Sequence, residues 1–138
     1  MKTVYQAYKE AREGINIKKN EKIILESKNI DYCYEFARDV PGANIKAFEE
    51  VILESKSPAY CYLFAENIQG ANKKELEKVV LESKHLSCCY YFARDVKDSN
   101  KEELFKVVLE IGDENYINIF LKDINFNKEK FKTYLLFI

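Results

Sequence analysis

The hydrophobic and polar positions along this chain alternate with the period of an α-helix. Over residues 59–68 the apolar side chains recur every three or four positions and share one helical face: Tyr60, Cys61, Phe64, Ala65 and Ile68. A second run has the same period: Leu76, Val79, Val80 and Ser83. No period-two alternation survives beyond a few residues, so the pattern predicts pairs of short helices and no strands.

Residues typical of helix ends flank both runs. Ser57 followed by Pro58 predicts the start of the first helix, because serine caps helix N-termini and proline favours the first helical position. Gly70 predicts its end, since glycine adopts the left-handed conformation readily. Asn72, with Glu75 three positions later, predicts a capping box that begins the second helix.

The pair of helices repeats every 28 residues. Several columns keep this spacing: Leu25, Leu53, Leu81 and Leu109; Phe36, Phe64, Phe92 and Phe120; Cys33, Cys61 and Cys89; Asn16, Asn44, Asn72 and Asn100. The glycine column is Gly14, Gly42 and Gly70, with Asp98 in the fourth place, and aspartate tolerates the same backbone region. A fixed period of this size is typical of stacked units that are not stable alone.

We therefore expect an all-α protein, an α-solenoid of about five 28-residue helical hairpins with about ten short helices. The whole of 1–138 forms one helical-repeat domain, with units at approximately 1–28, 29–56, 57–84, 85–112 and 113–138. In each second helix the leucine points away from the main apolar arc, so we expect it to be buried against the neighbouring unit. Leu53→Ala or Leu81→Ala should then cost about 2–5 kcal/mol.

The two ends of the array differ. Lys9 and Arg12 stand where 28-residue spacing places Ala37 and Val40, so the first helix is expected to face water, as a terminal capping unit does.

At the other end, the last helix is expected to begin after Asn127 and to turn four residues toward its own unit: Phe131, Tyr134, Leu135 and Ile138. Leu136 and Phe137 then remain uncovered. We expect a homodimer contact or a partner-docking surface through these two side chains. The alternative is that the last helix rotates or folds back and hides both.

Composition narrows the function classes. Twenty-two Lys and Arg against 23 Asp and Glu give a net charge of −1, which lacks the overall basic field of a typical nucleic-acid binder. The chain shows no secretory signal and no 18-residue apolar run, so we expect a soluble cytoplasmic protein without a membrane partner.

The cysteines and the single histidine do not form a chemical site. Cys33, Cys61 and Cys89 share one core column, and stacked helices lie about 8–10 Å apart, too far for a disulfide, so we expect buried free thiols. Cys88 and His85 could share a face, but zinc prefers four ligands, so no metal site is expected.

No catalytic set can be assembled either. The chain has no G-x-S-x-G motif and no glycine-rich phosphate loop, so we expect no enzyme activity, no catalytic residue and no cofactor. The carboxylate pairs Glu49–Glu50 and Glu102–Glu103 are expected to be solvated surface charge.

A row of tyrosines follows the edge of the first helices. Tyr34, Tyr62 and Tyr90 are each followed one turn later by a charged residue, respectively Arg38, Glu66 and Arg94. The row could be a recognition stripe, because tyrosine and arginine dominate interface hot spots. Equally, the rings could cover the seams between units with their hydroxyls in water. Aromatic rings beside arginine also suit single-stranded nucleic acid, but Glu66 and the net charge argue against that use.

The unit from Tyr34 to Phe48, with its Phe-Ala-Arg-Asp-Val core and Gly-Ala-Asn hinge, resembles a HEAT- or TPR-like helical-repeat unit of poorly characterised proteins of bacteria and their phages. The likeness spans nearly the whole chain, although the hinge becomes Asp98-Ser99-Asn100 in the fourth unit and the last unit departs over 120–124. The resemblance implies a scaffold without catalytic residues. By analogy, small phage or mobile-element proteins bind and inhibit a host protein, for example a defence nuclease.

These observations favour a non-catalytic protein–protein interaction module. Its expected partner-binding residues are those of the stripe and of the C-terminal end: Tyr34, Arg38, Tyr62, Glu66, Tyr90, Arg94, Leu136 and Phe137. The alternative is a single-stranded nucleic-acid-binding repeat protein.

Overall fold

The computed structural model describes residues 1–135, which contain ten α-helices, one 3₁₀ turn and no strand. The predicted all-α fold is confirmed. The first helices of the units are α1 (Val4–Arg12), α3 (Ile30–Asp39), α5 (Pro58–Asn67), α7 (Leu86–Asp95) and α9 (Glu114–Asp123). The second helices are α2 (Ile17–Ser27), α4 (Ile45–Ser55), α6 (Lys73–Ser83) and α8 (Lys101–Ile111).

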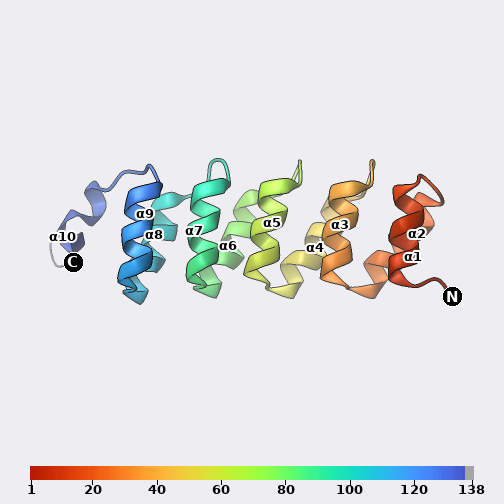
Figure 1. Cartoon of the computed structure of the whole chain (residues 1–138), viewed down its shortest axis with the longest axis horizontal. Helices are drawn as coiled ribbons and strands as arrows, with labels where there is room; N and C mark the ends of the chain where they lie inside the picture. Colours follow the sequence, from red (N-terminus) through yellow and green to blue (C-terminus); the bar gives the residue numbers. More distant parts are fainter. Residues whose placement is uncertain (136–138) are drawn as a thin grey trace.

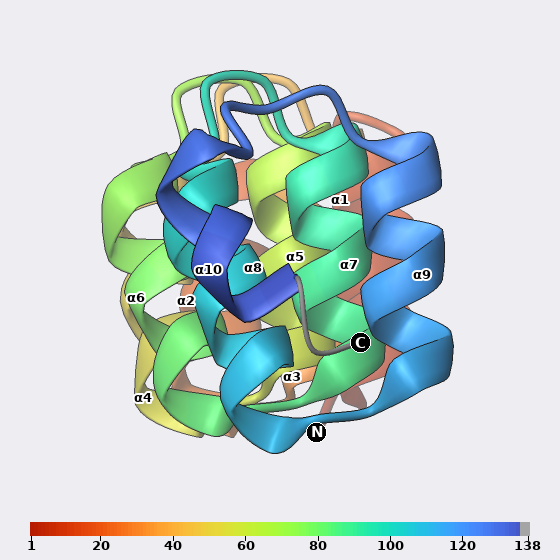
Figure 2. The same ribbon diagram turned by 90° about the vertical axis from the view of Figure 1, so that its left-hand side faces the viewer.

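The hairpins stack along one line into a two-layer solenoid. Figure 1 shows the first helices side by side from α1 at one end to α9 at the other. Viewed down the stack in Figure 2, the first helices form one layer and the second helices the other, and the loops that join the two helices of a unit gather along one edge. In the first four units the two helices of each hairpin contact each other, and α1 to α9 in one layer and α2 to α8 in the other each contact the matching helix of the neighbouring unit.

The residues that predict the helix starts cap them, and the predicted left-handed positions are present. The Ser57 side chain accepts a hydrogen bond from the Tyr60 N–H with Pro58 at the first position of α5, and Asn72 accepts one from the Glu75 N–H at the start of α6. Gly70 has φ +87°, and Asp98 adopts the same left-handed conformation at φ +63°. The hinge therefore keeps its shape in the fourth unit although its glycine is replaced.

The core lies between the two layers and follows the predicted columns. The side chains of two columns are fully buried: Cys33, Cys61 and Cys89, and Phe36, Phe64, Phe92 and Phe120. All four cysteines are free, as expected. Burial raises the pKa of Cys33 to about 11 and the pKa of Cys61 and Cys89 to about 12. These thiols therefore stay protonated near neutral pH and act as small apolar side chains.

The leucine column of the second helices is only half-buried, so Leu53 and Leu81 pack against the core but are less buried than expected. The column one residue earlier is the buried one: Ile24, Ile52, Val80 and Val108. The second helices of adjacent units touch much less extensively than the two helices of a hairpin. The side of the second helix that carries the leucines therefore remains partly open to water.

A lysine ends three of the second helices in the left-handed conformation. Lys28, Lys56 and Lys84 have φ of 57°, 57° and 55°, and Gly112 occupies the same column at φ +80°. A side chain in this region costs about 1–2 kcal/mol, whereas glycine pays no such steric cost.

We therefore expect Lys56→Gly to stabilise the protein by about 0.5–1 kcal/mol, because it removes strain at a position where helices favour glycine. Urea unfolding followed by circular dichroism measures the change. Lys78→Gly is the matched control, since Lys78 is an exposed lysine inside α6 and glycine there should cost about 1 kcal/mol. Loss of stability in Lys56→Gly would contradict the strain at this helix end.

The first helix of the first unit, α1, follows the repeat with a shift of two residues, whereas α2 keeps the 28-residue spacing. Its buried residues on α1 are Ala7, Tyr8 and Ala11, in the pattern of Cys33, Tyr34 and Ala37 on α3. Arg12 lies over the Tyr8 ring at 5.5 Å, as Arg38 lies over Tyr34 at 5.2 Å. Lys9 and Arg12 are exposed as expected, but Arg12 corresponds to Arg38, not to Val40. The cause is a shorter connection between the end of α1 and Gly14.

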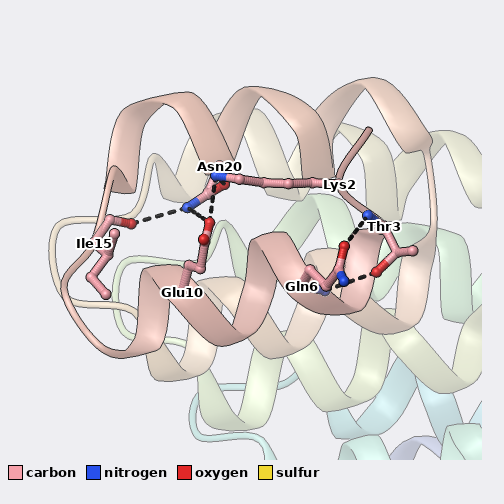
Figure 3. A network of polar contacts seen from close by, with 6 residues as sticks. All are labelled: Lys2, Thr3, Gln6, Glu10, Ile15 and Asn20. Carbon is pink, nitrogen blue, oxygen red and sulfur yellow. Dashed lines mark hydrogen bonds and ion pairs between the residues drawn. The ribbon is translucent and has the colours of Figure 1, made fainter.

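Polar side chains at this end replace a buried aromatic pair of the second unit. Glu10, in the shifted register, and Asn20, at the 28-residue spacing, stand where the second unit stacks Phe36 on Phe48, whose ring centroids are 5.0 Å apart. The Asn20 amide donates to Glu10 at 3.3 Å and to the Ile15 carbonyl at 3.0 Å, and Lys2 donates to Asn20 at 3.1 Å and pairs with Glu10 (Figure 3). The buried Asn20 is thereby satisfied, and the end of the array is polar.

The C-terminal end closes with aromatic rings. A 3₁₀ turn over Glu129–Phe131 and a single helical turn, α10 (Lys132–Leu135), replace the longer helix expected after Asn127. Phe131 is buried and Leu135 half-buried as predicted, but Tyr134 is 65% exposed, so its predicted inward orientation is wrong. The irregular turn ahead of α10 breaks the assumed helical register. Leu136, Phe137 and Ile138 lie outside the described residues, so contacts through Leu136 and Phe137 stay a prediction.

Candidate interaction surface

The tyrosines of the predicted stripe lie at the seams between units. Tyr34 and Tyr90 are each 7% exposed, and Tyr62 is half-buried. Their hydroxyls meet the last residue of the first helix in the following unit. Tyr62 donates to Asp95, Tyr90 donates to Asp123, and Tyr34 accepts from the Asn67 amide at 3.0 Å. Each of these hydrogen bonds ties one unit to the next.

The two arginines of the stripe are engaged with carboxylates of their own helices. Arg38 donates to both oxygens of Asp39 at 2.8 and 2.9 Å, and Arg94 donates to both oxygens of Asp95 at 2.7 and 2.8 Å. These hydrogen bonds hold the pKa of Asp39 and of Asp95 below the usual carboxyl value. The stripe therefore exposes two guanidinium groups whose charge is already compensated.

The six stripe residues therefore divide into two groups. The rings of Tyr34 and Tyr90 are part of the packing between units, as the seam interpretation expects, although their hydroxyls bond to protein groups rather than water. Arg38, Glu66 and Arg94 remain exposed. Tyr62 belongs to both groups, because its ring packs at a seam and its side chain is partly exposed.

Sequence reasoning missed the aromatic surface beside this stripe. The α5–α7–α9 patch consists of Tyr62, Leu63, Tyr91, Arg94 and Ile119. Tyr91 is 39% exposed, Ile119 is 37% exposed, and Leu63 is half-buried. The Tyr91 ring lies 5.8 Å from the Tyr62 ring, with the Arg94 guanidinium 5.0 Å from its centroid. The sequence did contain a signal for this surface: positions 63, 91 and 119 keep the 28-residue spacing and are apolar in three successive units.

A second unpredicted feature is a column of glutamates that links units through the backbone. Glu21, Glu49 and Glu77 accept hydrogen bonds from the N–H groups of Asn44 at 2.8 Å, Asn72 at 2.6 Å and Asn100 at 2.7 Å. Each contact binds the N-cap residue of the second helix in the next unit. Only the asparagine half of the capping box predicted at Asn72 forms, because Glu49 from the preceding unit takes the place expected for Glu75.

The expectation that Glu49 is solvated is therefore wrong. Its side chain is buried at 8% exposure, whereas its neighbour Glu50 is exposed. Burial raises the pKa of Glu49 and of Glu77, and the hydrogen bond from the asparagine N–H lowers it by less. The fold thus disfavours the charged form of both carboxyls.

The raised pKa values of Glu49 and Glu77 predict that the stability of the fold decreases as pH rises. A carboxyl whose pKa is higher in the folded than in the unfolded state destabilises the fold as pH rises through the interval between the two values. Glu49→Gln with Glu77→Gln keeps an acceptor oxygen and removes the titration. Between pH 4 and pH 7, starting near the unfolded value of 4.5, wild type should lose stability relative to the double variant. Urea unfolding across this range measures the difference, and parallel curves would contradict it.

The remaining chemical candidates have structural roles. The His85 ring nitrogen accepts the Cys88 N–H at the start of α7, in the position that Ser57 occupies at α5. Within residues 1–135 no group of three or more His, Cys, Asp or Glu side chains is placed to hold a metal ion. A hollow of 340 Å³ lies between α8 and the C-terminal turn, and its lining includes Glu102, Leu109, Lys130 and Phe131.

No family model, curated protein or solved structure matches this chain. The resemblance of its repeat unit to bacterial and phage helical repeats remains an expectation from sequence. Of the helices within residues 1–135, none combines the length and the apolar character needed to cross a bilayer.

Proposed function

We propose that this protein is a non-catalytic protein-interaction module that binds a protein partner through the α5–α7–α9 patch. The observation that carries the proposal is the exposed aromatic side chain of Tyr91, which lies beside the Tyr62 ring and the Arg94 guanidinium. Tyrosine and arginine in such clusters supply a large contact area at low entropic cost and dominate interface hot spots. Leu63 and Ile119 extend the apolar surface on both sides.

The state of the arginines favours a protein partner over single-stranded nucleic acid. A platform for nucleic acid combines stacked rings with cations that are available to phosphates. Arg38 and Arg94 each make two hydrogen bonds to an adjacent aspartate, and phosphate contacts would have to displace these pairs. Glu66 adds an exposed negative charge between them. The patch therefore suits a partner with apolar and polar groups better than a polyanion.

Affinity capture from the native source tests the proposal. Tyr91→Ser with Ile119→Ser should fold normally and lose the captured protein, because both side chains are exposed and contribute little to the core. Tyr5→Ser with Ile15→Ser is the matched control, since it removes a tyrosine and an isoleucine of the first unit that are even more exposed than Tyr91 and Ile119. Capture should survive nuclease treatment. Nucleic acid bound in a salt-sensitive manner, or unchanged capture by the patch variant, would contradict the proposal.

Inhibition of a host protein, such as a defence nuclease, is a further step that rests on the resemblance alone. Once a partner has been captured, its activity is measured with and without saturating amounts of this chain, and the result decides between inhibition and tethering.

The homodimer expected through Leu136 and Phe137 is tested by light scattering at high micromolar concentration. Dissociation in Leu136→Glu with Phe137→Glu would assign the contact to these residues.

A further inference from the structure

Three of the four seams between units place an arginine over the seam tyrosine. In each pair the arginine follows the tyrosine by one helical turn and its guanidinium lies over the ring: Arg12 over Tyr8 at 5.5 Å, Arg38 over Tyr34 at 5.2 Å and Arg94 over Tyr90 at 5.3 Å. A cation over the face of a tyrosine is held by the ring quadrupole. At three seams, therefore, the face of the seam tyrosine holds a guanidinium group.

At the remaining seam the arginine is replaced by a carboxylate. Tyr62 is followed one turn later by Glu66, and no cation lies over the Tyr62 ring within the described part of the chain. Glu66 is exposed and makes no ion pair with any residue of 1–135. The nearest guanidinium of the patch, Arg94, is held by both oxygens of Asp95.

Glu66 lies one helical turn after Tyr62 on α5, so the two side chains are neighbours on one face of the helix. Burial, then the hydrogen bond to Asp95, and then Glu66 raise the pKa of Tyr62. The ring of Tyr62 lies 5.8 Å from that of Tyr91, with a tilt of 32° between the two planes. One half-buried ring, one exposed ring and one unpaired carboxylate therefore converge on the same point of the surface.

We propose that Tyr62 and Glu66 form a receptor for an arginine side chain of the protein partner. The guanidinium lies on the Tyr62 ring, as Arg38 lies on Tyr34, and donates hydrogen bonds to the Glu66 carboxylate. Arginine fits better than lysine, because its planar group stacks on an aromatic face and donates two parallel hydrogen bonds to a carboxylate. This inference rests on the proposed function and names the partner chemistry that the α5–α7–α9 patch recognises.

A small probe tests the receptor without the partner. N-acetyl-arginine amide, titrated to tens of millimolar into the full chain with ¹³C-labelled tyrosine, should shift the ring resonances of Tyr62 and Tyr91 in a saturable manner. N-acetyl-citrulline amide, which has nearly the same shape without the charge, should shift them at least five-fold less. No shift at Tyr62, or equal shifts with both probes, would overturn the proposal.

Two variants of Glu66 separate the receptor from general surface charge. Glu66→Arg places at Tyr62 the residue that the other seams already hold, so the variant should fold, fill the site from within and abolish the probe shifts. Glu66→Gln should weaken them several-fold. The control Glu50→Gln removes an exposed carboxylate from the other layer and should leave them unchanged. Shifts that persist in Glu66→Arg would overturn the receptor.

The partner distinguishes this inference from the proposed function. If the patch variant with Tyr91→Ser and Ile119→Ser loses the captured protein, Glu66→Arg should also weaken its binding at least ten-fold. Partner binding that Glu66→Arg leaves unchanged would refute the arginine receptor, and the interaction module would stand. Probe binding at Tyr62 without loss of a captured protein from the patch variant would support the receptor and refute the wider patch.

Discussion

Phe64→Ala should destabilise the protein by about 3–5 kcal/mol, the range for removing a fully buried phenylalanine side chain. Phe64 lies on α5 in the central unit and is fully buried. Units on both sides hold the surrounding helices in place, so the cavity has little freedom to collapse. Urea unfolding followed by circular dichroism measures the loss.

Two comparisons make the result specific. Phe64→Leu keeps most of the apolar volume and should cost clearly less than Phe64→Ala. Leu53→Ala removes a half-buried side chain from α4 and should cost less than about 2 kcal/mol, at or below the lower end of the range expected from sequence. Equal losses in Phe64→Ala and Leu53→Ala would mean that the phenylalanine column is not the centre of the core.

The period, the helix pairs and the phenylalanine and cysteine columns were predictable, because they depend on local chain properties. Side chains at helical spacing share a face wherever the helix packs, and Ser57 or Asn72 caps its own helix through a contact three residues away. The left-handed backbone conformation of Lys56 was not predicted, since it follows from the turn that joins two units. No residue preference marks a lysine for that conformation.

The candidate interaction surface was harder to predict because it depends on the rotation of each helix within the stack. Tyr90 and Tyr91 are neighbours in sequence, and either could face the solvent. In the structure Tyr90 closes a seam and Tyr91 is exposed. Glu49 illustrates the same limit, since its partner is the backbone N–H of Asn72 in the next unit. Such contacts between units follow from how the units stack, which the periodicity of a single unit does not specify.

Phe105→Glu should produce the largest change at the C-terminal end, although it restores the residue type that the repeat carries in three earlier units. Those glutamates accept a backbone N–H of the following hinge: Glu21, Glu49 and Glu77. Phe105 instead packs against the rings of Phe120, Phe126 and Phe131 at 5.0, 4.9 and 5.0 Å, and is fully buried. A carboxylate there would lie among three aromatic rings.

The expected cost combines two effects. Loss of the phenylalanine from the core costs about 3–5 kcal/mol, and an unpaired buried charge adds several more. The fifth unit can open locally instead of tolerating this cost, because each unit of a solenoid contacts only its neighbours. We therefore expect Phe105→Glu to lose hydrogen-exchange protection over α8 and α9, whereas α3 to α6 keep theirs.

Hydrogen exchange measured by mass spectrometry distinguishes local opening from global unfolding. Phe105→Leu is the control, since it keeps an apolar side chain in the cluster and should preserve most of the protection in α8. Protection of α8 and α9 in Phe105→Glu equal to that of wild type would mean that the glutamate finds a partner at this end. The aromatic cluster would then not be what closes the array, and the fifth unit would be equivalent to the others.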